Sequence, residues 1–323
     1  MMRLSVPIMD YKATLNACIK GITGNNDLKA RVVAAEGDLL LAGEAYLTAG
    51  RAGNLCNITP IDTSSDSDPV VVSGIVKSEL IKLYEYYFVN EKKEARRIYD
   101  QILNAAHERC PFCGGIGTPR NLDHFLPKSK FPQFSTLPHN LVPSCRDCNI
   151  DGKSEKVPSV PSEQIIQPYL DDDRFFIDQW IFAEYSMASC NMPGTVRYFV
   201  RPPEQWEPVQ RERARQHFLD FGLAGRYAVK AAEHLGTIEG QIHAMKSIGA
   251  SNEIICAVLL VPGIEHAPFP NHWQRGMYQA LRDHVSANEC EQSDSHCDGA
   301  KKVFKRESHT SFCAPGAAGS QIL

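Results

Sequence analysis

The chain lacks any apolar segment long enough to cross a lipid bilayer. Its longest candidate, Ile254 to Val261, is far shorter than the ~20 residues that a membrane-spanning helix needs. The first residues also lack the unbroken apolar core of a secretory signal, because Asp10 and Lys12 fall where that core would lie. We therefore expect no membrane span and a protein of the reducing cytoplasm.

An excess of positive charge is missing as well. The chain has 34 Lys and Arg against 38 Asp and Glu, a formal net charge of -4, so it has no global basic field that would attract nucleic acid. Contacts to phosphates must come from local patches, and residues 106–156 hold seven Lys or Arg against five Asp or Glu. Internal repeats are not evident either, which argues against a solenoid.

Cysteine, by contrast, is abundant and informatively spaced. Eleven cysteines in a chain of this kind favour metal ligation over disulfides. Four of them form two Cys-x-x-Cys pairs, Cys110 with Cys113 and Cys145 with Cys148, which can close a tetrahedral zinc site. Such pairs are usually ~15–20 residues apart in a zinc ribbon, whereas 31 residues separate these two. The pattern predicts a structural zinc site with an insertion; buried free thiols are the alternative.

The inserted segment carries polar residues that a zinc site does not need. Asp123 and His124 lie in a short segment flanked by turn residues, and Asn140 comes shortly before the second cysteine pair. We predict a two-stranded hairpin formed by residues 121–125 and 141–142, followed by a helical turn that begins at Asn149.

This order of strand, strand and helix resembles the HNH (ββα-metal) endonucleases, and most closely their zinc-clasped members. The resemblance implies that Asp123 and Asn149 bind one Mg²⁺ or Mn²⁺ through oxygen atoms. It implies that His124 is the general base that activates water and that Asn140 bridges backbone groups to hold His124 in place. The substrate would be DNA, cut to leave 5′-phosphate and 3′-hydroxyl ends.

Three lysines near these residues are candidates for phosphate contact. Lys128 and Lys130 lie in the loop after His124, and Lys153 lies four residues after Asn149, on the same face if the helix persists. We predict that all three lysines contact phosphate. Solvated lysines are the alternative.

Two other functions remain open. The chain is alternatively a noncatalytic zinc module that binds nucleic acid or protein, in which Asp123 and His124 are structural, or a toxin-like RNase with the same metal geometry. Similar nucleases with large helical flanks occur in bacterial antiphage systems, often beside an ATPase. We therefore expect a bacterial cytoplasmic protein with DNA as partner and with an ATPase or regulatory protein as a candidate second partner.

Helical periodicity dominates the rest of the chain, so the predicted fold is α+β, mostly helical, with a central ββα-metal motif stapled by a four-cysteine zinc site. Predicted helices cover 28–48, 75–88, 95–106, 210–221, 226–245 and 273–285, and a hairpin joins 180–187 to 195–201. The predicted regions are 1–69 (helices and linker), 70–157 (helices plus the nuclease core, motif 110–153), 158–286 (hairpin and helices) and 287–323 (disordered tail).

Overall fold

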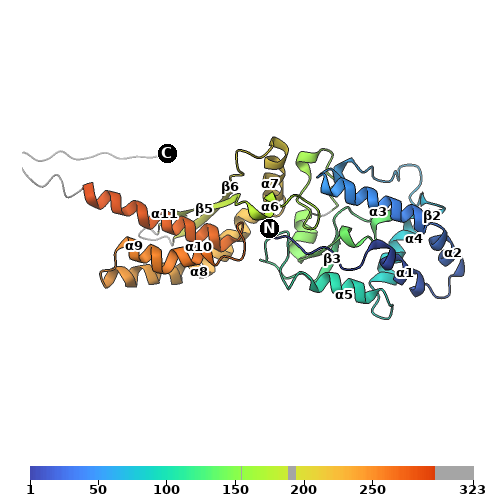
Figure 1. Ribbon diagram of the computed structural model, residues 1–323, viewed down its shortest axis with the longest axis horizontal. Helices are drawn as coiled ribbons and strands as arrows, with labels where there is room; N and C mark the ends of the chain where they lie inside the picture. Colours follow the sequence, from blue (N-terminus) through green and yellow to red (C-terminus); the bar gives the residue numbers. More distant parts are fainter. Residues whose placement is uncertain (154, 188–193, 295–323) are drawn as a thin grey trace, which may run out of the picture.

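The computed structural model describes residues 1–153, 155–187 and 194–294. The chain forms an elongated body with two lobes, and the N-terminus lies where they meet (Figure 1). The first lobe contains helices α1 to α5 and strand β3, and the second contains β5, β6 and helices α8 to α11. Among the described residues the strands form three separate two-stranded sheets. The predicted mixed, mostly helical class is confirmed.

Three helices open the first lobe, α1 (Tyr11–Gly21), α2 (Asn26–Ala34) and α3 (Glu36–Arg51), followed by a 3₁₀ turn, η1 (Leu55–Asn57). α1 begins after Asp10, whose Oδ1 accepts a hydrogen bond of 2.7 Å from the Ala13 amide. Asn25 caps α2 in the same way. The single helix predicted over 28–48 is wrong in one respect, because α2 and α3 are distinct and meet at Ala35.

A hairpin and three helical segments lead to the cysteines. They are β1 (Val70–Val72), β2 (Ile75–Val76), α4 (Lys77–Lys82), the π-helical η2 (Leu83–Phe88) and α5 (Arg96–Asn104). The helix predicted over 75–88 begins only at Lys77, because Ile75 and Val76 form β2, and the helix predicted over 95–106 is present as α5. Apolar positions such as Leu80 and Ile102 are buried. Because α1 packs against η2, and α3 against η3 (Pro132–Phe134), elements on both sides of the predicted 69/70 boundary share one core.

The predicted hairpin around Asp123 is present. β3 (Asn121–His124) pairs antiparallel with β4 (Leu141–Ser144), and their connection contains η3 and another 3₁₀ turn, η4 (Pro138–Asn140). A π-helical turn, η5 (Cys148–Lys153), follows the second cysteine pair. A β-carbon at Gly152 in this turn would lie 2.5 Å from Cδ1 of Phe221, so glycine lets the turn pack against the segment after α7.

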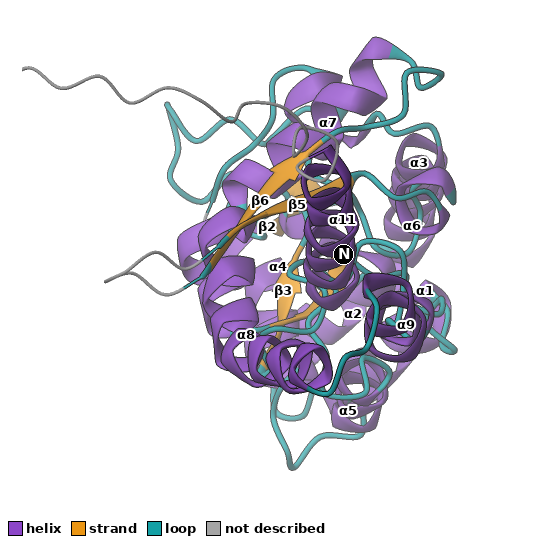
Figure 2. Ribbon diagram, turned by 90° about the vertical axis from the view of Figure 1, so that its left-hand side faces the viewer, coloured by secondary structure: helices purple, strands orange, loops and turns teal. Residues whose placement is uncertain are grey.

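The second lobe is built on the predicted hairpin of β5 (Ile181–Ser186) and β6 (Thr195–Val200), which is confirmed. A 3₁₀ turn, η6 (Pro161–Glu163), and a short helix, α6 (Arg174–Ile177), precede it. The helices that follow are α7 (Pro208–Asp220), α8 (Leu223–Ser247), α9 (Asn252–Ile255), the π-helical η7 (Cys256–Leu260), α10 (Val261–Glu265) and α11 (Trp273–Asp294). α11 packs on β5 and α8 on β6, and Figure 2 shows the strands enclosed by helices.

α11 extends into the segment that was predicted to be a disordered tail. Because this helix reaches Asp294, it includes the first residues of the segment 287–323 that was predicted to be disordered. Residues 295–323 lie outside the part of the chain that the structure describes.

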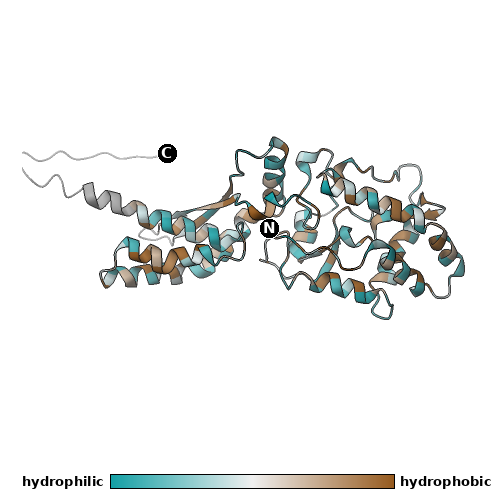
Figure 3. Cartoon of the chain, in the orientation of Figure 1, coloured by the Kyte–Doolittle hydropathy of each residue, from teal (hydrophilic) through white to brown (hydrophobic). Residues whose placement is uncertain are grey.

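Hydrophobic and hydrophilic residues are interspersed along the helices of both lobes (Figure 3), as expected where each helix buries one face. Within the described ranges, no helix is both long and apolar enough to span a membrane. The buried side chains form a contiguous core that reaches from Met1 and Leu4 to Leu281 and Val285, and it includes the four paired cysteines.

Candidate functional site

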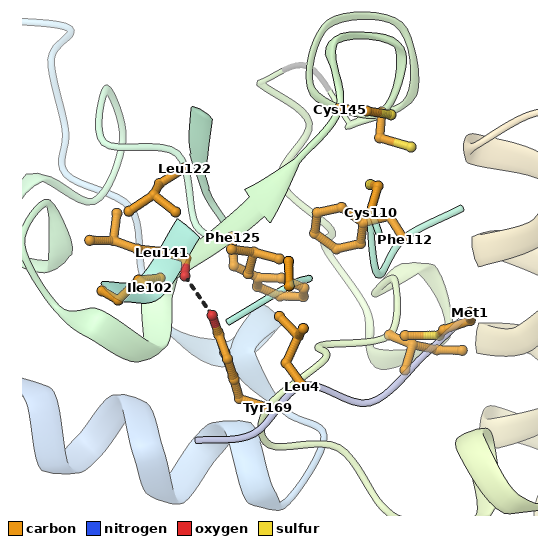
Figure 4. Close-up of a cluster of buried hydrophobic side chains, with 14 of the residues drawn as sticks. Met1, Leu4, Ile102, Cys110, Phe112, Leu122, Phe125, Leu141, Cys145 and Tyr169 are labelled. Carbon is orange, nitrogen blue, oxygen red and sulfur yellow. Dashed lines mark hydrogen bonds between the residues drawn. The ribbon is translucent and has the colours of Figure 1, made fainter. Parts of the chain in front are cut away.

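The hairpin of β3 and β4 is the scaffold of the site. Asp123 pairs with Val142, and His124 with Leu141, so both polar residues lie on a buried strand. Apolar side chains gather around the hairpin, and the Tyr169 hydroxyl donates a hydrogen bond of 3.1 Å to the Leu141 carbonyl (Figure 4). Strand β3 is thus held on a packed core, which fixes the backbone that carries Asp123 and His124.

The four predicted zinc ligands come together. The sulfur atoms of Cys110, Cys113, Cys145 and Cys148 all lie within 4.8 Å of one another, and all four residues are buried. The Gly117 amide donates to Sγ of Cys113 over 3.3 Å, and a β-carbon at Gly117 would lie only 2.4 Å from Sγ of Cys145. Four thiolates around one centre are a donor set that suits Zn²⁺, so the cluster could hold a structural zinc ion.

His124 has a defined tautomer. Its side chain is buried, and Nε2 lies 2.9 Å from the carbonyl oxygen of Ser135. A carbonyl can only accept, so Nε2 carries the proton and donates it. Burial lowers the pKa of His124 to about 3, so the ring is neutral near pH 7 and Nδ1 keeps its lone pair. The Tyr84 ring packs edge-on against the imidazole, with 4.3 Å between centroids.

Asp123 is buried next to an ammonium group. Its Oδ2 has no hydrogen-bond partner among the described residues, and Nζ of Lys153 lies 3.4 Å from that oxygen. Burial raises the pKa of Asp123, and the charge of Lys153 opposes the shift; burial likewise lowers the pKa of Lys153. Nζ of Lys153 also donates to the His124 carbonyl over 2.5 Å. Lys153, predicted to contact phosphate, is therefore a buried partner of β3.

Asn140 connects three backbone groups beneath the site. Its Oδ1 accepts a hydrogen bond of 2.7 Å from the Leu126 amide, and its Nδ2 donates to the carbonyls of Leu126 and Phe134, both over 3.1 Å. Phe134 immediately precedes Ser135, whose carbonyl accepts from His124. The fully buried Asn140 side chain thus ties the loop after β3 to the segment that orients the imidazole.

One pocket collects most of the predicted polar residues. It has a volume of about 420 Å³, and Asp123, His124, Asn149, Lys128 and Lys153 all line it. Lys128 pairs with Glu85, which also lines the pocket, over 3.4 Å. Lys130 is not among the lining residues, and its carbonyl accepts a hydrogen bond from the Ile61 amide. The arrangement brings a carboxylate, an amide and a neutral imidazole to one cavity.

Two contacts at the site were not predicted. The Ser135 carbonyl orients His124 from 11 residues away, and the Arg226 guanidinium donates to Sγ of Cys148 from 78 residues away. A backbone carbonyl has no side-chain signature, and Arg226 lies far outside the motif. Neither contact had a signal in the sequence pattern.

Comparisons with known proteins give one informative match. No protein-family model matches the chain, and no solved structure matches it. Protein ea31 of Escherichia phage lambda is 34% identical to it over 293 residues, which cover 87% of this chain and 97% of that protein. Because the identity extends over nearly all of both proteins, the chain belongs to the family of phage lambda protein ea31.

Proposed function

We propose that this protein is a metal-dependent endonuclease of the HNH (ββα-metal) type that hydrolyses phosphodiester bonds in DNA. The observation that carries the proposal is the convergence of Asp123, His124 and Asn149 on one pocket, from a strand and the helical turn that follows the hairpin. Oxygen donors beside a neutral imidazole are the groups that metal-assisted hydrolysis requires.

His124 is the general base in this mechanism. The Ser135 carbonyl holds the proton on Nε2, so the free Nδ1 lone pair can take a proton from the attacking water. Asn140 supports this role indirectly, because its hydrogen bonds fix the loop next to Ser135.

Asp123 and Asn149 would hold the catalytic Mg²⁺ or Mn²⁺ through oxygen atoms. The fit rests on Oδ2 of Asp123, a buried oxygen without a hydrogen-bond partner in the described part of the chain, and on Asn149 at the same pocket. Few protein ligands and room for water suit these hard cations. A cation held there would supply Lewis-acid chemistry toward the scissile phosphate.

The lysines have different roles in this proposal. The Lys153 ammonium favours the charged form of Asp123 and anchors the helical turn to β3 through the His124 carbonyl. Lys128, which is partly exposed at the pocket, is the side chain placed to contact a phosphate. Lys130, outside the lining residues, is the weaker candidate for such a contact.

The biological setting that we propose is the bacterial cytoplasm, where phages and their hosts compete. The family relationship to a phage lambda protein supports that setting. A role as an effector in antiphage defence, with an ATPase or regulatory protein as partner, is the specific form of this proposal.

One observation favours a second function, a noncatalytic zinc module that binds nucleic acid or protein. Asp123 pairs with Lys153, and His124 donates to a backbone carbonyl. Side chains with a purely structural role would make the same contacts. An RNase would use the same cavity as the proposed DNase, so the substrate must be tested directly.

The decisive experiment incubates the purified protein with plasmid DNA and, separately, with RNA, in the presence of Mg²⁺ or Mn²⁺. His124→Ala should lower DNA cleavage by about 10²–10⁴-fold, the usual contribution of a general base. His266→Ala, which removes an exposed histidine, is the matched control and should cut like the wild type. Equal cleavage by His124→Ala and wild type would contradict the mechanism, and cleavage of RNA alone would identify an RNase. If no nucleic acid is cut under any condition, the binding module is favoured.

A further inference from the structure

The second lobe contributes a positive charge to the four-cysteine cluster. Arg226, in the first turn of α8, donates from Nη1 to Sγ of Cys148 over 3.2 Å and from Nη2 to Sγ of Cys145 over 3.7 Å. These two sulfur atoms belong to the second Cys-x-x-Cys pair. The guanidinium therefore bridges both thiols of one pair with its two terminal nitrogens.

The guanidinium is held in place by further contacts. Nη1 also donates to the Phe221 carbonyl over 3.3 Å, and Nη2 lies 3.4 Å from Oδ2 of Asp147. The Arg226 side chain is only 20% exposed. Gly222, which precedes α8, has a φ of 56°, a conformation that glycine adopts without strain and that turns the chain from α7 into α8.

α7 and the residue that follows it cover the first cysteine pair. Nε2 of His217 donates to the carbonyl of Phe112, which lies between Cys110 and Cys113, over 2.8 Å. The ring of Phe221 stacks on that of Phe112, with 4.9 Å between centroids. α7 and Phe221 thus contact the segment of the first pair, and Arg226 of α8 gives a charged donor to the second pair.

A zinc ion with four thiolates carries two negative charges in excess, and this cluster is buried. A nearby cation offsets that charge, and hydrogen bonds to sulfur make a thiolate a poorer base and nucleophile. We propose that Arg226 is a positioning residue of the zinc site, which retains the metal by neutralising the thiolates of Cys145 and Cys148. The inference depends on zinc in the four-cysteine cluster and not on cleavage of nucleic acid.

The experiment measures zinc retention in the zinc-loaded, full-length protein. Zinc release is followed with the chromophoric chelator 4-(2-pyridylazo)resorcinol, and the cysteines that react with N-ethylmaleimide are identified by peptide mass spectrometry. Arg226→Gln should release zinc about 10- to 100-fold faster than the wild type, as expected when a supporting partner of a metal ligand is lost. In Arg226→Gln, N-ethylmaleimide should modify Cys145 and Cys148 before Cys110 and Cys113.

Two further variants make the result specific. Lys230→Gln removes a positive charge one turn later on α8, where Lys230 pairs with Glu233, and should release zinc at the wild-type rate. Arg226→Lys keeps the charge but cannot bridge two sulfur atoms, so it should release zinc faster than the wild type and more slowly than Arg226→Gln. If Arg226→Gln fails to fold, faster release from Arg226→Lys than from the wild type still tests the proposal. Wild-type release rates in both Arg226 variants would overturn the proposal. So would first modification of Cys110 and Cys113, or a wild-type protein that binds no zinc.

Discussion

Replacing Asn140 with alanine tests whether the hydrogen bonds under the site control its chemistry. The substitution removes three hydrogen bonds and leaves the amide and the carbonyl of Leu126 without partners, whereas the Phe134 carbonyl keeps the hydrogen bond from the Leu137 amide. Each buried group left without a partner costs about 1–3 kcal/mol, so the two groups of Leu126 should lower the free energy of unfolding by about 2–6 kcal/mol. Urea unfolding followed by circular dichroism measures this loss.

Asn271 is the matched control for Asn140. It is also fully buried, and its Oδ1 accepts from the amides of Trp180 and Ile181 over 2.8 and 3.0 Å. Its Nδ2 donates to the Asp178 carbonyl over 2.8 Å, so Asn271→Ala should cost a similar free energy, but in the second lobe.

The comparison separates loss of stability from loss of geometry. At a low temperature where circular dichroism shows both variants folded, Asn140→Ala should cut DNA about 10²-fold more slowly than Asn271→Ala, because a small misplacement of His124 costs about that much. Equal rates of cleavage by the two folded variants would refute the role of Asn140 in holding the base.

Two further predictions concern the metal and the pH dependence of stability. Gly117→Ala places a β-carbon 2.4 Å from Sγ of Cys145, so elemental analysis should find well below one zinc ion per chain. Gly225→Ala on α8, which has open space around its β-carbon, is the control and should bind zinc like the wild type. Full zinc content in Gly117→Ala would contradict the packing argument. Burial lowers the pKa of His217 to about 3 from 6.5, so between these pH values the unfolded state is protonated at this histidine and the folded state is not. The contribution of His217 to stability is therefore complete above pH 6.5 and declines as the pH falls toward 3. The loss from His217 should reach about 2 kcal/mol near pH ~5, and urea unfolding of His217→Gln should show a shallower decline between neutral pH and that point; an unchanged slope would count against a buried neutral His217.

Local patterns predicted the parts of the fold in which neighbours in sequence decide the structure. The two Cys-x-x-Cys pairs predicted a four-cysteine cluster, and turn residues around alternating strands predicted the hairpins of β3 with β4 and of β5 with β6. α1 was missed although Asp10 is an N-cap residue that could have marked its start. The break between α2 and α3 was not predicted, because Ala35 is not a glycine or a proline, the residues that usually interrupt a helix.

The candidate site was less predictable where distant segments meet. Lys153 lies four residues after Asn149, which suggested a side chain facing phosphate, but the carboxylate of Asp123 lies across the turn and draws the ammonium inward. A sequence pattern cannot show which face of a short helical turn is covered, because the covering strand comes from elsewhere. The same reason hides Arg226, which reaches the cysteines only through the packing of α8.

The distance along the chain between Cys148 and Arg226 has a consequence for synthesis on the ribosome. The two residues are 78 positions apart, and bacterial and other ribosomes add ~5–20 residues per second, so Cys148 emerges roughly 4–16 s before the guanidinium that contacts it. Throughout that interval the nascent chain contains Cys145 and Cys148 but not yet Arg226, whose guanidinium contacts them in the folded protein. The second cysteine pair therefore receives its hydrogen bonds from Arg226 only after α8 has been synthesised.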